Sequence, residues 1–224
     1  MSQIIHLPHT DTEKVFNWTQ GIVQQTGPRL TGDPSTKLAA EIIQKDWQSY
    51  CASTTLDSFI VHPKAFLDWI RLLVVFYAVS VILIWFNATW VSWINAILIT
   101  LGILIMVLEF FFYMEVLDPI FPKKSGYNVI GTIEPEGEVK QQIILSGHHD
   151  SAYVFNFFVH QPKLYSFRIY SGLGVIGLSF LVYWGWAIWW SISQIEPTIF
   201  PLIWRILSII FFLFVVQLWF FRAN

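Results

Sequence analysis

Four long apolar segments constrain the fold of this 224-residue chain more than any other feature. They cover approximately residues 67–86, 91–108, 169–192 and 199–221. Each is long enough to cross about 30 Å of hydrocarbon, which takes roughly 20 helical residues. Tryptophans stand near their ends, as in the aromatic belts of membrane proteins. Only 12% of the residues are charged, against roughly 25% in soluble domains. The sequence therefore predicts a multi-pass membrane protein that contacts the lipid bilayer. The alternative, a soluble protein with a large core of buried helices, is disfavoured.

The spans form two hairpins, and the distribution of basic residues predicts their orientation. The tips, at about 87–89 and 193–198, contain no Lys or Arg. The opposite side carries Lys64, Lys123, Lys124, Lys163 and Arg222. The positive-inside rule then places both termini and all soluble segments in the cytoplasm, with Arg205 as an exception on the tip side. The net charge of −2 gives no reason to expect a nucleic-acid partner.

The polar segments between the spans carry a helix-then-strand pattern. Residues 10–25 and 35–50 have helical apolar spacing, and Asp33-Pro34 is a favourable start for the second helix. Strands are expected at 54–61, 128–133 and 142–146. We expect a partial α/β domain interrupted by two transmembrane α-helical hairpins. The expected division is 1–63 and 123–165 for the soluble part, with hairpins at 64–122 and 166–224.

A candidate metal motif, Gly147-His148-His149-Asp150-Ser151, follows the third expected strand. A strand that ends in a His-x-Asp pair presents an imidazole where the chain leaves the sheet and where sites are usually built. The acid can then hold the other ring nitrogen and fix the orientation of the imidazole. This pattern suits His148 as a zinc ligand and Asp150 as its orienting partner. A histidine considered by itself would more often be structural, but the setting of His148 in this motif after an apolar strand favours a metal ligand.

Together, three segments resemble the metallopeptidase family of zinc aminopeptidases and glutamate carboxypeptidases. They are the Gly27-Pro28-Arg29-Leu30-Thr31-Gly32 turn with its helix, the strand beginning Asn128-Val129-Ile130, and the His148 motif. The resemblance covers about residues 11–61 and 126–151. It implies peptide-bond hydrolysis by zinc-activated water, with His148 as a metal ligand and Asp150 as its orienter. His149 falls at the family's variable position and receives no role.

The family's remaining site residues have no counterpart in this sequence. These are an Asp that bridges two zinc ions, a Glu-Glu pair, a further Asp and a last His. After Asp150 the only acidic residue is Glu196, whereas catalytic zinc typically takes three protein ligands.

We therefore expect the N-terminal portion of a membrane-anchored zinc peptidase, without stable zinc or peptidase activity of its own. Its peptide substrate would be a partner of the complete protein. The alternative is a non-catalytic membrane scaffold or binding protein with a peptidase-like half-domain.

Overall fold

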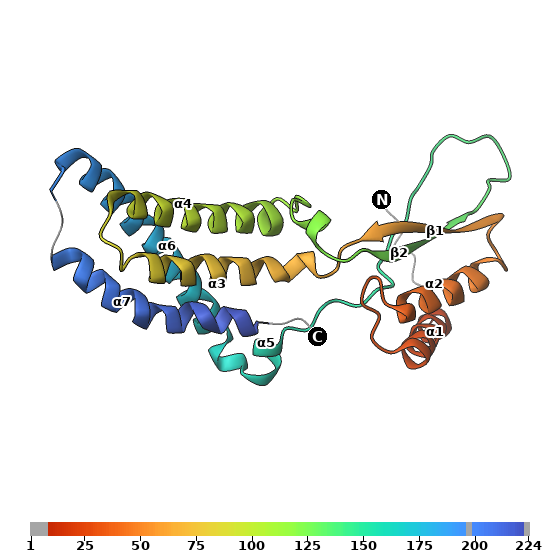
Figure 1. Ribbon diagram of the computed structural model, residues 1–224. Coiled ribbons are helices and arrows are strands. Elements are labelled where there is room, and N and C mark those ends of the chain that lie inside the picture. The colour runs from red at the N-terminus through yellow and green to blue at the C-terminus, as the bar shows by residue number, and fades with distance from the viewer. Residues whose placement is uncertain (1–8, 196–198, 222–224) are drawn as a thin grey trace, which may run out of the picture. The chain divides into compact units, whose positions relative to one another are not determined.

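The computed structural model describes residues 9–195 and 199–221 (Figure 1). The chain forms two compact units, and each is built from two separate stretches of sequence. The first unit consists of Met1–Pro63 and Lys123–Ala152, and the second of Lys64–Pro122 and Tyr153–Asn224. The first unit contains the candidate metal motif, and the second contains the long apolar helices.

The first unit places two helices against a small antiparallel sheet. Helices α1 (His9–Thr26) and α2 (Pro34–Trp47) precede strand β1 (Ser53–Val61), which pairs with β2 (Lys124–Thr132). The core is small: Ile22, Ala39 and Ile43 are buried together, with Ile42, Trp47 and Val129 packed against them. These elements confirm the two expected helices and the first two expected strands. The sheet is the only one among the described residues.

The expected start of α2 is confirmed, but two details of this unit differ from the sequence pattern. Asp33 is the N-cap residue in extended conformation and Pro34 begins the helix, but the Asp33 side chain makes no capping hydrogen bond. It accepts a hydrogen bond from Lys124 Nζ at 2.6 Å instead, so its carboxylate links α2 to β2. Val15, Trp18 and Leu38 follow the apolar spacing of their helices, yet all three are exposed. Helix α2 packs on the two strands, whereas α1 packs on α2.

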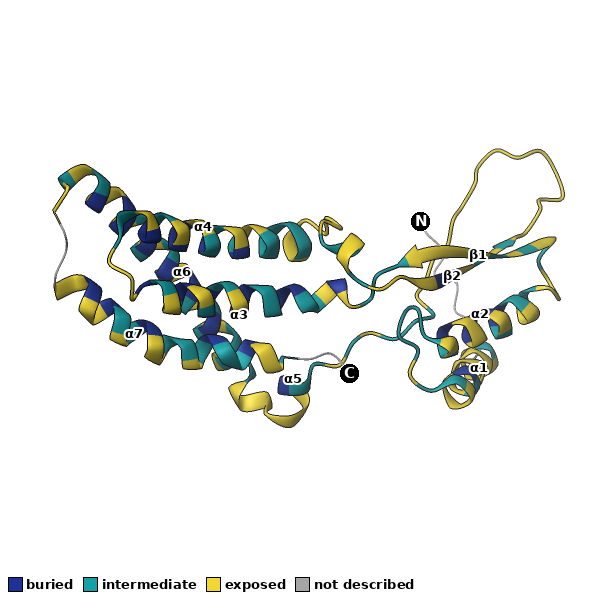
Figure 2. Cartoon of the chain, viewed as in Figure 1, coloured by how far each residue is buried: buried dark blue, intermediate teal, exposed yellow. Residues whose placement is uncertain are grey.

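The expected third strand, at 142–146, does not form. Residues 133–149 carry no helix or strand (Figure 2), and Ile143, Ile144 and Leu145 are between 74% and 92% exposed. A strand requires a neighbour to accept and donate its backbone hydrogen bonds. Within the described residues β2 pairs with β1 only, and no further strand is present. Across those residues the architecture is mostly helical, with seven α-helices and one two-stranded sheet.

The second unit contains four helices that are long and apolar enough to cross a membrane. The spans are Ala65–Leu83, Thr89–Phe111, Pro162–Ser193 and Ile199–Phe220. They correspond to α3 (Ala65–Leu83), α4 (Thr89–Met106) with the π-helix η1 (Val107–Phe111), α6 (Pro162–Ser193), and α7 (Ile199–Val216) with the 3₁₀-helix η3 (Gln217–Phe220). A short α5 (Asn156–His160) precedes α6, and the 3₁₀-helix η2 (Asp118–Ile120) follows η1. The four predicted spans are confirmed, although α6 begins seven residues earlier than expected.

The outer surface of this unit is apolar. In no span is more than 39% of the most apolar window buried inside the structure, so most of these side chains face outward (Figure 2). Trp85, Trp90 and Trp189 are exposed near the hairpin tips, where interfacial tryptophans are expected. The length and composition of these helices give the chain the architecture of a multi-pass membrane protein.

Small residues and indole hydrogen bonds hold the four helices together. A Cβ atom added at Gly102 of α4 would lie 2.6 Å from Leu73 Cδ1 of α3, so these helices touch closely. Trp93 Nε1 donates to Ser191 Oγ at 3.0 Å, and Trp184 Nε1 donates to Thr100 Oγ1 at 2.9 Å. Close glycine contacts and interhelical hydrogen bonds are the usual means of association in lipid, where apolar burial between helices gives little driving force.

Arg205, the basic residue on the tip side, has specific partners. Its Nε donates to the carbonyl oxygen of Ile84 at 2.9 Å, and its Nη2 donates to Asn87 Oδ1. The guanidinium also lies 5.6 Å from the ring centroid of Trp85. A cation at the carboxyl end of a helix satisfies carbonyl groups that lack intrahelical donors. Arg205 therefore joins α7 to the end of α3 rather than standing as a free positive charge.

Candidate metal-ligand site

Two segments separated by more than a hundred residues meet in the first unit. The backbone N–H of Ser151 donates to the carbonyl oxygen of Arg29 at 2.8 Å, and the N–H of Arg29 donates to Ser151 Oγ at 3.0 Å. The turn between α1 and α2 is thereby fastened to the end of the His148 motif. These are the first and third segments on which the sequence resemblance rests.

The Arg29 side chain extends this connection. Its Nε donates to the carbonyl oxygen of His149 at 2.9 Å, while Nη1 donates to the carbonyl oxygen of Gly27 at 2.9 Å and to Thr26 Oγ1 at 3.2 Å. Gly27 has a φ of 63°, a left-handed conformation that glycine adopts at little cost at the end of a helix. One guanidinium therefore connects the carboxyl end of α1 to the loop that carries His148.

The Asp150 carboxylate is held from both sides. Thr31 Oγ1 donates to its Oδ2, and its Oδ1 lies 3.1 Å from Nδ1 of His148. Burial alone would raise the pKa of Asp150, but the hydrogen bonds from Thr31 and His148 outweigh it and hold that pKa below its ordinary value. Asp150 is therefore a carboxylate at neutral pH and can only accept hydrogen bonds.

The carboxylate determines the tautomer of His148. Because Asp150 only accepts, the proton of a neutral imidazole lies on Nδ1, which leaves the lone pair of Nε2 available. The His148 side chain is 94% exposed, whereas that of Asp150 is 29% exposed. A neutral, oriented imidazole with a free Nε2 is the form that ligates zinc, and a carboxylate on the opposite nitrogen is the usual outer partner.

His149 has a different environment from its neighbour. Its Nε2 is buried and makes no hydrogen bond to any described residue. Burial lowers the pKa of His149, although the nearby Asp150 acts in the opposite direction. His149 is therefore neutral at pH 7, and its contribution to this loop is the backbone carbonyl that Arg29 holds.

The described residues do not form a complete zinc site. Nowhere in 9–195 or 199–221 do three or more His, Cys, Asp or Glu side chains come together to hold a metal ion. His148 and Asp150 are brought together as expected, but a catalytic zinc takes about three protein ligands. This unit supplies one oriented imidazole.

Sequence reasoning missed the residues that position this pair. Arg29 and Thr31 lie in the first segment of the resemblance, but no sequence pattern predicted that this turn contacts the loop at 149–151. The sequence did contain a signal for these contacts. Arg29 and Thr31 lie on a turn bounded by glycines, and both side chains are hydrogen-bond donors that require acceptors. The structure gives them the His149 carbonyl and the Asp150 carboxylate.

No family model, no curated protein and no solved structure matches this chain.

Replacing Arg29 with alanine is expected to loosen the loop that carries His148. The change removes the guanidinium bonds to His149, Gly27 and Thr26, and hydrogen bonds of charged groups contribute about 1.5–3 kcal/mol each when well formed. Arg29 is only partly buried, so we expect the low end of that range. The amide of Ser151 should then exchange with deuterium about tenfold faster or more, since 1.4 kcal/mol corresponds to a factor of ten. Hydrogen-exchange mass spectrometry of a peptide containing Ser151 measures this.

Two variants control this experiment. Arg29→Lys keeps the charge but lacks the planar fork, so it should recover only part of the protection. Lys14→Ala removes an exposed ion pair with Asp11, at 3.6 Å, and should leave exchange at Ser151 unchanged. Equal exchange in Arg29→Ala and the unmodified protein would show that the guanidinium does not hold this loop.

Proposed function

We propose that this chain is the N-terminal, membrane-embedded portion of a zinc-dependent peptidase. In this proposal His148 ligates the metal, and Asp150 orients the imidazole of His148. The observation that supports this most is the exposed imidazole of His148, whose Nδ1 faces a carboxylate that Thr31 holds in place. An imidazole fixed in this way is oriented to bind a metal ion through Nε2. The resemblance to zinc aminopeptidases and carboxypeptidases rests on the same residues. We also propose that the first unit is part of the α/β domain that this resemblance implies.

Zinc would supply a water activated for attack on a peptide carbonyl. Among the described residues, His148 is the one candidate ligand held in orientation, and no pair of Glu side chains lies beside it. Further ligands and the general base would therefore have to come from residues beyond those described. We accordingly expect residues 1–224 alone to bind zinc weakly and to hydrolyse no peptide.

A non-catalytic scaffold or binding protein is the second candidate. It is favoured by the lack of a group of three metal-binding side chains within the described residues. In this case the His148–Asp150 contact would serve only to shape the loop, and the first unit would act as a docking module on a membrane anchor.

Isolation of the protein from its native membrane distinguishes the two candidates. The preparation would be analysed for zinc by elemental mass spectrometry and for hydrolysis of aminoacyl and peptide substrates, with and without a chelator. Bound zinc with chelator-sensitive hydrolysis is the result expected for the peptidase. A native preparation without zinc and without hydrolysis would contradict the peptidase proposal and support the scaffold function. The same assays on residues 1–224 should show neither property.

We also propose that both termini and the first unit lie in the cytoplasm. Lys64, Lys123 and Lys163 lie at the ends of the spans opposite the hairpin tips, and the one described basic residue on the tip side, Arg205, is engaged with α3. Glu196 and Arg222, which belong to the same sequence argument, lie outside the described residues.

Cysteine accessibility tests this orientation. In a Cys51→Ser background, reporters at Asn87→Cys and Gln194→Cys should react with an impermeant maleimide added outside intact cells. A reporter at Lys123→Cys should react only after the membrane is opened. The opposite labelling pattern would reverse the orientation.

A further inference from the structure

The seam between α6 and α7 is closed at one end and open at the other. A Cβ added at Gly172 would lie 2.8 Å from Leu218 Cδ1 of η3 and 3.0 Å from the carbonyl oxygen of Phe214 of α7. A Cβ added at Gly185, further along α6 toward the hairpin tip, would meet no atom within 4 Å. The two helices therefore pack tightly at the first position and leave space at the second.

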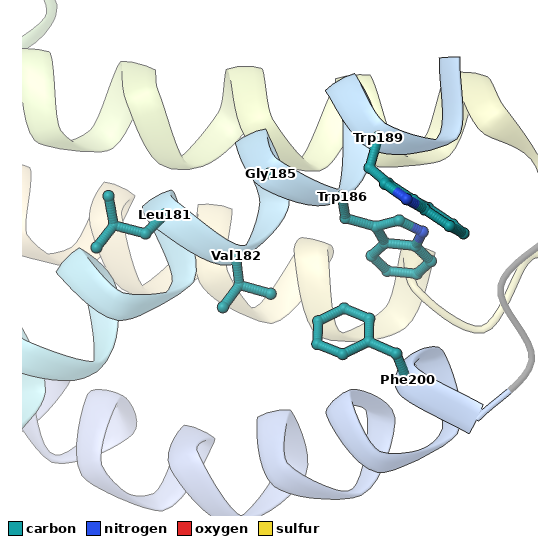
Figure 3. Close-up of a pocket in the computed structure, with 6 residues that line it drawn as sticks. All are labelled: Leu181, Val182, Gly185, Trp186, Trp189 and Phe200. Carbon is teal, nitrogen blue, oxygen red and sulfur yellow. The ribbon is translucent and has the colours of Figure 1, made fainter. Parts of the chain in front are cut away.

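That space is a cavity of about 360 Å³ (Figure 3). Its lining consists of Leu181, Val182, Gly185, Trp186 and Trp189 of α6 and Phe200 of α7. None of these residues is charged, and their side chains are aliphatic or aromatic. The volume lies in the range of about 300–1,000 Å³ that is typical of ligand pockets.

Aromatic packing fixes the inner wall. The Trp186 ring stacks on Trp190, with centroids 6.0 Å apart and an interplanar angle of 6°, and it meets Phe200 edge-on at 6.2 Å. Trp186 is 6% exposed, so neighbouring residues hold it on nearly all sides. A wall that is already in place costs a ligand little ordering entropy.

The mouth of the cavity faces the surroundings of the membrane-spanning unit. Leu181, Trp189 and Phe200 are all substantially exposed at its edge. With a rise of 1.5 Å per helical residue, Trp189 lies about 6 Å and Leu181 about 18 Å along α6 from its last residue, Ser193. The hydrocarbon of one leaflet is about 15 Å deep. The lining from Leu181 to Trp189 therefore covers about 12 Å of α6 near its tip-side end, a length comparable to the depth of one leaflet.

We propose that this cavity binds one acyl chain of a membrane phospholipid from the tip-side leaflet. Three properties point to this ligand: the lining is apolar and uncharged, the length matches a single leaflet, and the open side faces the region that lipid chains occupy. Burial of methylene groups against the fixed aromatic wall supplies the affinity. The site belongs to the four-helix unit and is independent of the metal-ligand site.

Photocrosslinking tests this proposal. The protein would be placed in nanodiscs that contain phosphatidylcholine with a diazirine on one acyl chain, irradiated and mapped by peptide mass spectrometry. Crosslinks should concentrate on the peptides that contain Leu181, Trp186 and Phe200. Gly185→Leu fills the open space and should reduce these crosslinks about tenfold, as expected when roughly two methylenes lose their apolar contact.

Gly177→Leu is the matched control. It makes the same chemical change on the same helix, also with no atom within 4 Å of the added Cβ, but Gly177 does not line the cavity. It should leave the crosslinks at Trp186 and Phe200 unchanged. Leu181→Trp narrows the mouth at an exposed position and serves if Gly185→Leu fails to fold; it should cause a similar loss. Undiminished crosslinking in the cavity-filling variants, or an equal loss in Gly177→Leu, would overturn the proposal. The crosslinks would then reflect only non-specific contact between lipid chains and the helix surface.

Discussion

Under the proposed peptidase function, His148→Ala in the protein isolated from its native membrane is expected to remove the bound zinc and to reduce peptide hydrolysis by more than about 100-fold. The change deletes an exposed imidazole whose Nδ1 is held by a carboxylate and whose Nε2 is left for a metal ion. Loss of an outer partner of a zinc ligand costs about 10–100-fold in metal affinity or activity, and loss of the ligand itself should cost more. Zinc content by elemental mass spectrometry and chelator-sensitive turnover measure the two effects separately.

Graded variants separate a ligand from a loop-shaping residue. Asp150→Asn keeps the size of the side chain but loses the negative charge, so we expect zinc affinity or activity to fall about 10–100-fold. Thr31→Val removes the donor to Asp150 and should have a smaller effect in the same direction, which Thr31→Ser should restore. His160→Ala, at an exposed position in α5, should change nothing. Full zinc content and activity in His148→Ala would remove this residue from any metal site.

Gly172→Leu is expected to produce the largest loss of stability in the four-helix unit. The new side chain would collide with Leu218, which could move, and with the backbone carbonyl of Phe214, which could not move without shifting α7. Such a shift would also break the bonds from Gln217 Nε2 to the Arg168 carbonyl and to Ser171 Oγ, both 3.2 Å long. Overpacking typically costs about 1–3 kcal/mol, and the lost hydrogen bonds add to that cost. Thermal unfolding in detergent or nanodiscs measures the effect as a lower melting temperature.

A second glycine of the same helix provides the comparison. Gly174→Leu adds the same side chain at an exposed position where a Cβ meets no atom within 4 Å, so its melting temperature should remain close to that of the unmodified protein. Adding Leu218→Ala to Gly172→Leu should restore part of the loss by removing the movable partner of the clash. Equal melting temperatures for the two leucine variants would mean that α6 and α7 do not pack closely at Gly172.

The membrane-spanning helices could be predicted from sequence because their signal is local. A run of about 20 apolar residues is sufficient to identify a span, and all four expected spans are present. The packing between them was not predictable from composition, because glycines that face a neighbour and glycines that face outward look the same in sequence. Gly172 and Gly174 illustrate this, since only the first is close to another helix.

The soluble unit shows where pattern reasoning fails. The apolar run Ile143-Ile144-Leu145 has the composition of a buried strand, yet it is exposed and unpaired. Strand formation depends on a neighbour as well as on propensity, and the sequence pattern carries no information about that neighbour. The His148–Asp150 contact was predicted correctly because its partners are only two positions apart in the sequence. The bonds from Arg29 and Thr31 join residues about 120 positions apart, and no local pattern predicts such pairs.

The register of β1 against β2 has a consequence for biogenesis. Val61, the last residue of β1, pairs with Lys124, the first residue of β2, and everything between them belongs to the first membrane hairpin and its flanks. In a membrane the sheet can therefore close only if α3 and α4 cross the bilayer as a pair, because a single crossing would leave β1 and β2 on opposite sides. A ribosome that has delivered only one of these spans leaves β1 without its partner. An unpaired β1 would thus mark a chain in which only one of the two spans has crossed, so a protease that recognises unpaired strands could remove such chains.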